Sequence, residues 1–163
     1  MTQPPDPVAP ADDTARALAR SLLAEARHAA LAVIEPGTGA PFVSRIALAP
    51  APGGVPVSLI SGLAVHCRAL RENPACALLL GEPGDRGDPL THPRLSLRAR
   101  AEFVAPDAPG RADLRAHYLA ARPKATLYAD FADFSFVLFH PVSAVLNGGF
   151  ARAYALHPAD LLA

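Results

Sequence analysis

The sequence is poor in the features that mark several classes of protein. It has no tryptophan, and its only cysteines, Cys67 and Cys76, form neither a disulfide framework nor a CxxC pair. Lys+Arg 15 equals Asp+Glu 15, so the chain lacks the basic excess that a general nucleic-acid binder needs. No apolar run approaches the roughly 20 residues that a membrane span requires. We therefore expect a cytoplasmic protein with no nucleic-acid or membrane partner.

The common catalytic motifs are also missing. The chain contains no GxSxG nucleophile turn, no GxGxxG after a strand and no GxxxxGK[ST] loop. Its six histidines show neither HExxH nor another close metal-ligand spacing. A bound cofactor that brings its own chemistry would suit such a sequence.

The hydrophobic pattern is that of short strands with a few helices. With 51% hydrophobic residues in 163, the chain can bury one core. Alternation is clearest from Arg94 to Val104. The predicted strands cover 30–34, 41–48, 55–60, 75–80, 94–104, 133–139 and 143–147. The predicted helices cover 14–29, 63–72 and 109–121, with shorter helical pieces at 125–131 and 158–162.

The connections between the predicted strands indicate the fold class. Several are short turns, such as the Pro-Gly-Thr-Gly segment at 36–39, and short turns join antiparallel strands. We expect a mainly β fold with flanking helices, arranged as an antiparallel barrel, because closure removes exposed strand edges. Residues 12–163 would form this single domain. Residues 1–11 are proline-rich, lack an apolar signal-peptide core and would form a disordered tail.

One candidate binding segment follows the strand at 55–60. Ser61 and Gly62 lead from this strand into the helix at 63–72, whose N-terminus has free backbone N–H groups and a partial positive charge. With Ser61, His66 and Arg68 as further donors, the segment suits a phosphate. The alternative is an ordinary helix cap with a surface histidine.

Two other places carry polar residues in apolar surroundings. Ser44 and Arg45 interrupt the strand at 41–48, where a charge must reach solvent, a partner or an anion. Arg94 begins its strand directly after the Gly- and Pro-rich loop at 81–93, where a cleft could lie. The alternatives are snorkelling to solvent for Arg45 and a solvated outer face for Arg94.

Four stretches of the chain together resemble the pyridoxamine 5′-phosphate oxidase-like FMN-binding split barrels. Among these, the sequence is most similar to the HugZ-like haem-utilisation branch. The most specific likeness lies in the strand, turn and helix that end at Asn73-Pro74, and in Gly148-Gly149-Phe150. The four stretches are residues 41–45, 59–74, 84–95 and 147–153.

The resemblance implies an antiparallel, six-stranded split β-barrel that forms a homodimer with FMN at the subunit interface. It places the strand around Ser44 along the flavin ring and the segment from Ser61 to Arg68 at the phosphate. His66 stands where the oxidase branch has a lysine, Ser44 where it has an arginine, and Arg94 near its flavin-contacting glutamine. The implied cofactor-binding residues are Ser44, Arg45, Ile46, Ser61, His66, Arg68 and Arg94.

Three functions stay open at this point, and no catalytic residue is identified. The first is an FMN-dependent oxidoreductase. The second is a haem-binding or haem-degrading protein on the same fold, in which His157 would correspond to the C-terminal histidine that ligates iron in the haem-utilisation relatives. The alternative for His157 is a helix-capping or surface residue before Pro158. The third is a non-catalytic module that binds a small molecule or forms a dimer.

Overall fold

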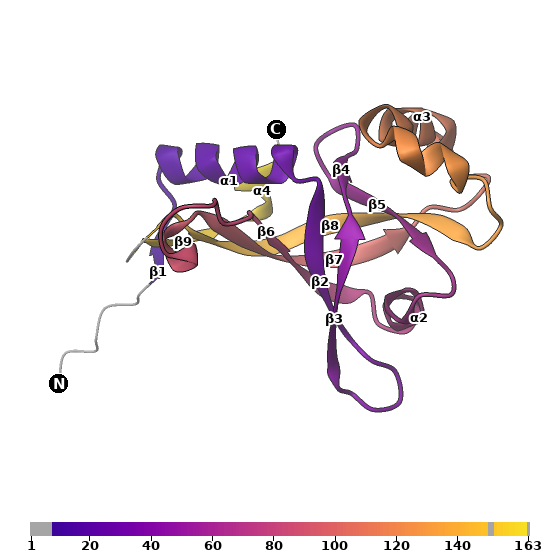
Figure 1. Ribbon diagram of the computed structural model, residues 1–163, viewed down its shortest axis with the longest axis horizontal. Coiled ribbons are helices and arrows are strands. Elements are labelled where there is room, and N and C mark those ends of the chain that lie inside the picture. Colours follow the sequence, from indigo (N-terminus) through magenta and orange to yellow (C-terminus); the bar gives the residue numbers. More distant parts are fainter. Residues whose placement is uncertain (1–7, 150–151, 163) are drawn as a thin grey trace.

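The computed structural model describes residues 8–149 and 152–162. These residues form a mainly β structure with helices along its edges and faces (Figure 1). Nine strands join in one mixed sheet, whose main path runs β1-β9-β8-β7-β6-β2-β3, while β5 pairs with β4 and β8. No helix in these ranges is long and apolar enough to cross a membrane.

The predicted hairpin at the start of the sheet is confirmed. Strands β2 (His28–Ile34) and β3 (Pro41–Ala47) pair antiparallel in a continuous register, and their tip projects beyond the rest of the molecule (Figure 1). Gly37 and Gly39 adopt φ of 81° and 69° in the turn, a region that glycine enters at low cost. Alternation along β3 turns Ser44 and Ile46 inward and leaves Arg45 exposed.

The next elements follow the predicted order. Strand β5 (Pro56–Ser61) leads into α2 (Val65–Glu72), which ends at Asn73 because Pro74 cannot continue a helix. Strands β6 (Ala75–Leu80) and β7 (Arg94–Phe103) pair antiparallel, and β7 shows the expected alternation of buried and exposed residues. The loop between them contains the short 3-10 helix η1 (Pro89–Thr91), which was not predicted.

The two strands predicted at 133–139 and 143–147 are one strand, β8 (Phe134–Asn147). The segment between the two predicted strands contains Pro141, which cannot donate a ladder hydrogen bond. The structure accommodates Pro141 by a shift in the β7–β8 register between Arg98 and Ala99, which leaves an extra residue on β8. The long strand therefore connects both halves of the sheet.

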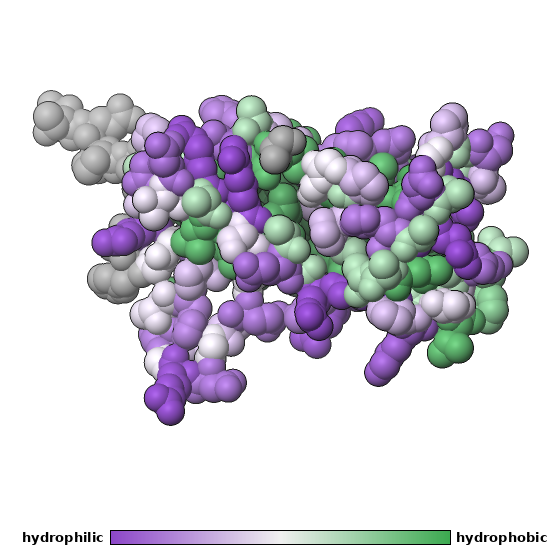
Figure 2. Space-filling view, turned by 90° about the horizontal axis from the view of Figure 1, so that it is seen from above, coloured by the Kyte–Doolittle hydropathy of each residue, from purple (hydrophilic) through white to green (hydrophobic). Residues whose placement is uncertain are grey.

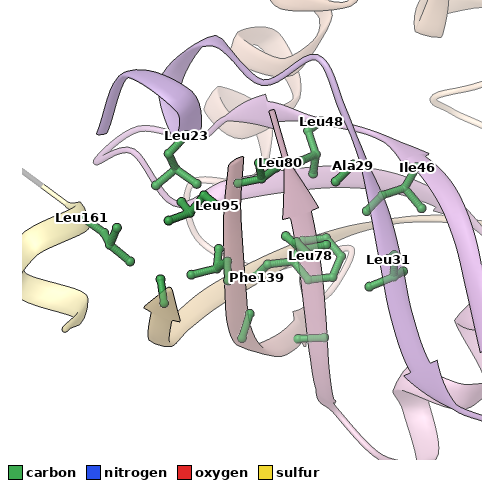
Figure 3. Packing of buried hydrophobic residues seen from close by; sticks show 14 of the residues in the cluster. Leu23, Ala29, Leu31, Ile46, Leu48, Leu78, Leu80, Leu95, Phe139 and Leu161 are labelled. Carbon is green, nitrogen blue, oxygen red and sulfur yellow. The ribbon is translucent and has the colours of Figure 1, made fainter. Parts of the chain in front are cut away.

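A second, smaller apolar cluster lies under α3 (Arg111–Ala121) and the following 3-10 helix η2 (Pro123–Leu127). Tyr118 packs edge-on against Phe136 of β8, with ring centroids 5.6 Å apart. The two-residue strand β4 (Ala49–Pro50) pairs with the start of β5 beside this cluster. The larger cluster fills the space between the sheet, α1 (Asp13–Glu25) and α4 (Pro158–Leu161), and Figure 3 shows Leu23, Ile46, Leu95 and Leu161 converging there.

The ends of the chain differ from the prediction. Residues 8–10 were assigned to a disordered tail, but Val8–Pro10 forms β1 and pairs with β9 (Ala153–Leu156). This pairing is parallel, so the sheet is not purely antiparallel as expected. Local sequence could not indicate it, because the two segments meet only through the tertiary fold. The predictions for residues 1–7, Phe150 and Ala151 lie outside the described residues.

The sheet is not closed into a barrel. Strands β3 and β5 approach each other, yet no strand pairing joins them within the described residues. The free edge of β5 begins at Ser58, since its pairing with β4 ends at Val57. The expected six-stranded antiparallel barrel is thus an open, mixed sheet, and the gap between β3 and β5 positions the candidate site.

Candidate functional site

A groove of about 290 Å³ lies between the facing edges of β3 and β5 and ends at the start of α2. Both strand edges lack a ladder partner here, so their backbone N–H and C=O groups face the groove. The groove is lined by Arg45, Ile46, Ala47, Ser58, Leu59, Ile60, Ser61, Ala64, His66, Tyr128 and Phe134. Four of the predicted site residues, Arg45, Ile46, Ser61 and His66, therefore lie together.

Ser44 belongs to the same cluster through His66. Its hydroxyl Oγ lies 2.9 Å from Nδ1 of His66, and both side chains are partly buried. Burial lowers the pKa of His66 below its usual value of 6.5, because desolvation disfavours the charged imidazolium. The pair joins the middle of β3 to the first turn of α2.

The N-terminus of α2 is open toward an anion. Its N-cap is Ala64, which has no side-chain cap, and no acidic residue stands in its first turn. Within the described residues, the backbone N–H groups of Val65 and His66 donate no hydrogen bond. Free N–H groups and the helix dipole favour negative charge at such a position.

The hydroxyl of Ser61 is already engaged. It donates to Oδ2 of Asp133 at 2.8 Å and accepts from the N–H of Leu63 at 3.2 Å. The N–H of Gly62 donates to the backbone oxygen of Asp133 at 2.6 Å. The turn before α2 is thus held by the segment before β8, and a carboxylate lies beside the predicted phosphate site.

Arg68 and Arg94 do not line the groove. Arg68 is exposed on α2. The guanidinium of Arg94 donates from Nη1 to the carbonyl of Leu90 at 3.0 Å, so it braces the loop at 81–93. That loop returns tightly at Gly81, where a Cβ would lie 2.6 Å from the carbonyl oxygen of Pro93.

His157 does not line the groove: β9, which precedes it, pairs with residues 144–147 of β8, whereas β5 pairs with residues 134–138 of that strand. It is exposed at the N-cap of α4, directly after β9, and its backbone N–H donates to Oδ2 of Asp160 at 2.8 Å. Asp160 also accepts from Nε of Arg16 at 2.8 Å, which ties α4 to α1. In the described part of the chain, no group of three or more His, Cys, Asp or Glu side chains could hold a metal ion.

Four residues at or beside the groove were missed at the sequence level. Tyr128 lies in the segment before β8, and Phe134 is the first residue of β8. Their ring centroids lie 5.0 Å apart. Asp133 precedes Phe134, and Ser58 lies within β5. Ser58 had a visible signal, because it is a polar residue inside an apolar strand, as Ser44 is; the other three meet the groove only after folding.

Apolar side chains are exposed next to this region. Leu63, in the turn before α2, is 89% exposed, and Leu127 and Phe131 are 79% and 58% exposed. Figure 2 shows hydrophobic surface at the end of the molecule that carries α3. The groove therefore opens beside an apolar surface.

Comparisons with known proteins agree with this geometry. No protein-family model matches the chain. It is 37% identical over 117 residues to the noncanonical haem oxygenase HOZ, chloroplastic, of Arabidopsis thaliana, which covers 71% of this chain. The chain spans only 34% of that plant protein.

Solved structures match over most of the chain. One that is 46% identical covers 94% of this chain and 98% of its own, with a TM-score of 0.85. The haem-binding protein of Mycobacterium smegmatis is 28% identical, with a TM-score of 0.81, and the match covers 92% of this chain and 60% of that one.

A more distant structure shares the fold alone. The putative pyridoxamine 5′-phosphate oxidase of Listeria innocua is 11% identical, with a TM-score of 0.62 over 79% of this chain and 94% of its own. The open sheet, the groove beside α2 and these similarities lead to one assignment. The chain belongs to the pyridoxamine 5′-phosphate oxidase-like split-barrel family, and its relatives include a haem-binding protein and a noncanonical haem oxygenase.

Proposed function

We propose that the chain binds FMN in the groove between β3 and β5 and acts, as a homodimer, as a flavin-dependent oxidoreductase. The observation that carries this proposal is the Ser44–His66 pair at the uncapped N-terminus of α2. It offers backbone N–H groups and an imidazole to the phosphate, and no acidic side chain of the first turn opposes them.

The rest of the groove suits a planar heterocycle. Ile46, Tyr128 and Phe134 provide apolar and aromatic contacts, while the free edges of β3 and β5 provide backbone donors and acceptors. FMN, when bound, supplies the electron transfer. The residues of this chain would bind the phosphate, orient the ring and exclude water from one of its faces.

The homodimer is supported by an uncovered face of the sheet. Val43, Ala32, Ala77 and Arg98 are successive cross-strand neighbours on the outside of β3, β2, β6 and β7. Exposed apolar residues continue this surface, with Val43 62%, Val142 57%, Leu79 46% and Ile34 44% exposed. Apolar surface of this extent is typical of a protein interface. Arg45, which lines the groove, lies on the same outer face.

At a site on the subunit interface, Arg68 and Arg94 would contact the ligand bound in the groove of the second chain. Neither lines the groove of its own chain. A second chain would bring further residues to the ligand, so both stay predictions that a structure of the FMN-bound dimer tests.

The proposal is tested by titrating cofactor-stripped protein with FMN and with riboflavin, which lacks the phosphate. We expect micromolar FMN binding, followed by quenching of flavin fluorescence. His66→Ala should weaken FMN binding about tenfold and leave riboflavin binding unchanged, because only the phosphate contact is lost. His66→Lys, which places a cation beside the phosphate, should restore FMN affinity.

Two results would contradict the proposal. One is equal affinity for FMN and riboflavin in the wild-type protein, which would show that the phosphate is not recognised. The other is the absence of binding for both.

Haem is the second candidate ligand, supported by the haem-related names of the plant and mycobacterial relatives. In this case His157, exposed before α4, would supply an iron ligand. Added haem should then give a Soret band that is lost in His157→Ala and retained in His117→Ala, an exposed histidine on α3. A Soret band unchanged in His157→Ala would exclude His157 as the ligand.

A further inference from the structure

Ser58 is a polar residue in a buried, apolar stretch of β5. It is 1% exposed and is the polar side chain in the buried set of the described residues. Its hydroxyl makes no hydrogen bond within those residues. A buried hydroxyl without a partner is unfavourable, so an alanine there would be expected if packing alone mattered.

The hydroxyl of Ser58 forms no hydrogen bond that would stabilise the sheet. The backbone of Ser58 pairs with Val137 of β8 on one side, and the pairing with β4 has already ended at Val57. Val57 and Leu59 belong to the cluster under α3, whereas Ile60 belongs to the main core. Because side chains alternate along a strand, Ser58 shares the face of Ile60.

Ser58 also lines the candidate groove. It stands on the free edge of β5, across from Arg45, Ile46 and Ala47 of β3. Ser61 lies three positions further along β5, which is roughly 10 Å at the usual rise of a strand. The groove thus has an anion-binding end at α2 and a single buried hydroxyl about 10 Å away along β5.

We propose that Ser58 determines the ligand specificity of this groove, by forming a hydrogen bond with a polar atom on the edge of the bound ring. The inference rests on the proposed FMN site and adds a residue to it. The ligand class is a heteroaromatic ring with a hydrogen-bonding edge, joined to an anionic group. For a flavin, the pyrimidine edge meets this requirement and the dimethylbenzene edge does not, so Ser58 would also set the orientation of the ring.

The test separates the ring contact from the phosphate contact. Ser58→Ala should weaken FMN and riboflavin binding equally, by about three- to tenfold, because both ligands carry the same ring. His66→Ala should affect FMN alone. Ser58→Cys, of similar size with a weaker donor, should fall between wild type and Ser58→Ala. Ser135→Ala, on β8 and outside the groove lining, is the matched control.

Thermal unfolding of the ligand-free proteins provides an independent readout. The melting temperature of Ser58→Ala should equal or exceed that of the wild type, because the lost hydroxyl had no partner to lose. A lower melting temperature would show that Ser58 supports the fold, and would overturn the inference. Unchanged flavin affinity in Ser58→Ala would overturn it as well while leaving the FMN site intact, whereas a wild-type protein that binds neither flavin would overturn both.

Discussion

At the scale of the residue, two serines inside apolar strands carry the chemistry of the groove. The hydroxyl of Ser44 lies within hydrogen-bond distance of His66, whereas that of Ser58 forms no hydrogen bond in the described structure. Ser58 lies in a strand whose neighbouring residues are all buried, and Ser44 lies on the inward face of β3 with Ile46. A polar residue at such a position is informative because burial without a partner is costly.

The shifted pKa of His66 predicts how stability depends on pH. The folded protein favours the neutral form of His66 more strongly than the unfolded chain does, because burial lowers the pKa of His66 below 6.5. Above pH 6.5 this contribution to stability is fully present. As pH falls below 6.5, the unfolded chain takes up the proton first, and stability is lost until the folded pKa is reached.

Urea unfolding between pH 8 and pH 5 measures this effect. His66→Gln cannot be protonated, so it should lose less stability over this range than the wild type does. The same loss in both proteins would show that other groups account for the pH dependence.

We predict that removing the charge of Asp133 increases the affinity for FMN. Its carboxylate accepts the hydroxyl proton of Ser61 and stands beside the N-terminus of α2, where it would repel a phosphate. Asp133→Asn removes this charge but keeps the backbone contact with Gly62. We expect FMN to bind several-fold more tightly and riboflavin to bind as before, measured by the same fluorescence titration. Weaker FMN binding would mean that Asp133 orders the turn rather than opposing the ligand.

At the scale of the element, the short α2 is held by its apolar face, which packs into the main core beside β2. Cys67, Ala69 and Leu70 are buried, while its N-terminus stays uncapped at the groove. A helix of eight residues has little stability by itself, so this packing is what keeps its N–H groups in place. The uncapped end of the helix and its buried face are thus separate.

Arg122 connects the end of α3 to two segments that are distant from it in the sequence. At the end of α3, its guanidinium donates to the carbonyl of Leu48, before β4, and at 3.5 Å to that of Ala26, at the end of α1. Arg122→Ala should lower the free energy of unfolding by about 2–3 kcal/mol, because buried carbonyls lose a charged donor. The shift of the urea midpoint measures this loss.

Arg115→Ala is the control for this prediction. Arg115 pairs with the exposed carboxylate of Asp130, and exposed ion pairs add little to stability. An equal shift of the urea midpoint in both variants would contradict the prediction that Arg122 stabilises the fold more than Arg115 does.

At the scale of the whole molecule, the helices cover one side of the sheet and leave the row through Val43, Ala32 and Ala77 uncovered. Sedimentation should give a species of twice the 17.0 kDa mass of one chain. Val43→Asp should dissociate it, because the new charge would be buried in the interface. Leu127→Asp, at an apolar and still more exposed position outside this row, should leave the dimer intact.

The flavin affinity of the same variants connects assembly to the site. Arg45 belongs both to the uncovered face and to the groove, so a monomeric Val43→Asp should bind FMN more weakly. A monomeric wild-type protein would exclude the dimer from the proposal.

Much of this protein follows from local sequence. The periodicity of 2 along β7, the glycines of the β2–β3 turn and the stop at Pro74 are local effects, and the structure confirms the elements that they predict. Pro141 shows the limit of such arguments. The rule that proline ends a central strand failed because a bulge against β7 absorbed it.

The mainly β class, the strand–turn–helix at 56–72 and the polar residues inside apolar strands can all be predicted from local sequence. Three features depend instead on long-range packing: the pairing of β1 with β9, the opening of the sheet between β3 and β5, and the approach of His66 to Ser44 while Arg94 stays outside the groove. The physical reason is that periodicity depends on neighbours along the chain. A groove depends instead on which strand edges face each other, and that is settled by the packing of the whole sheet.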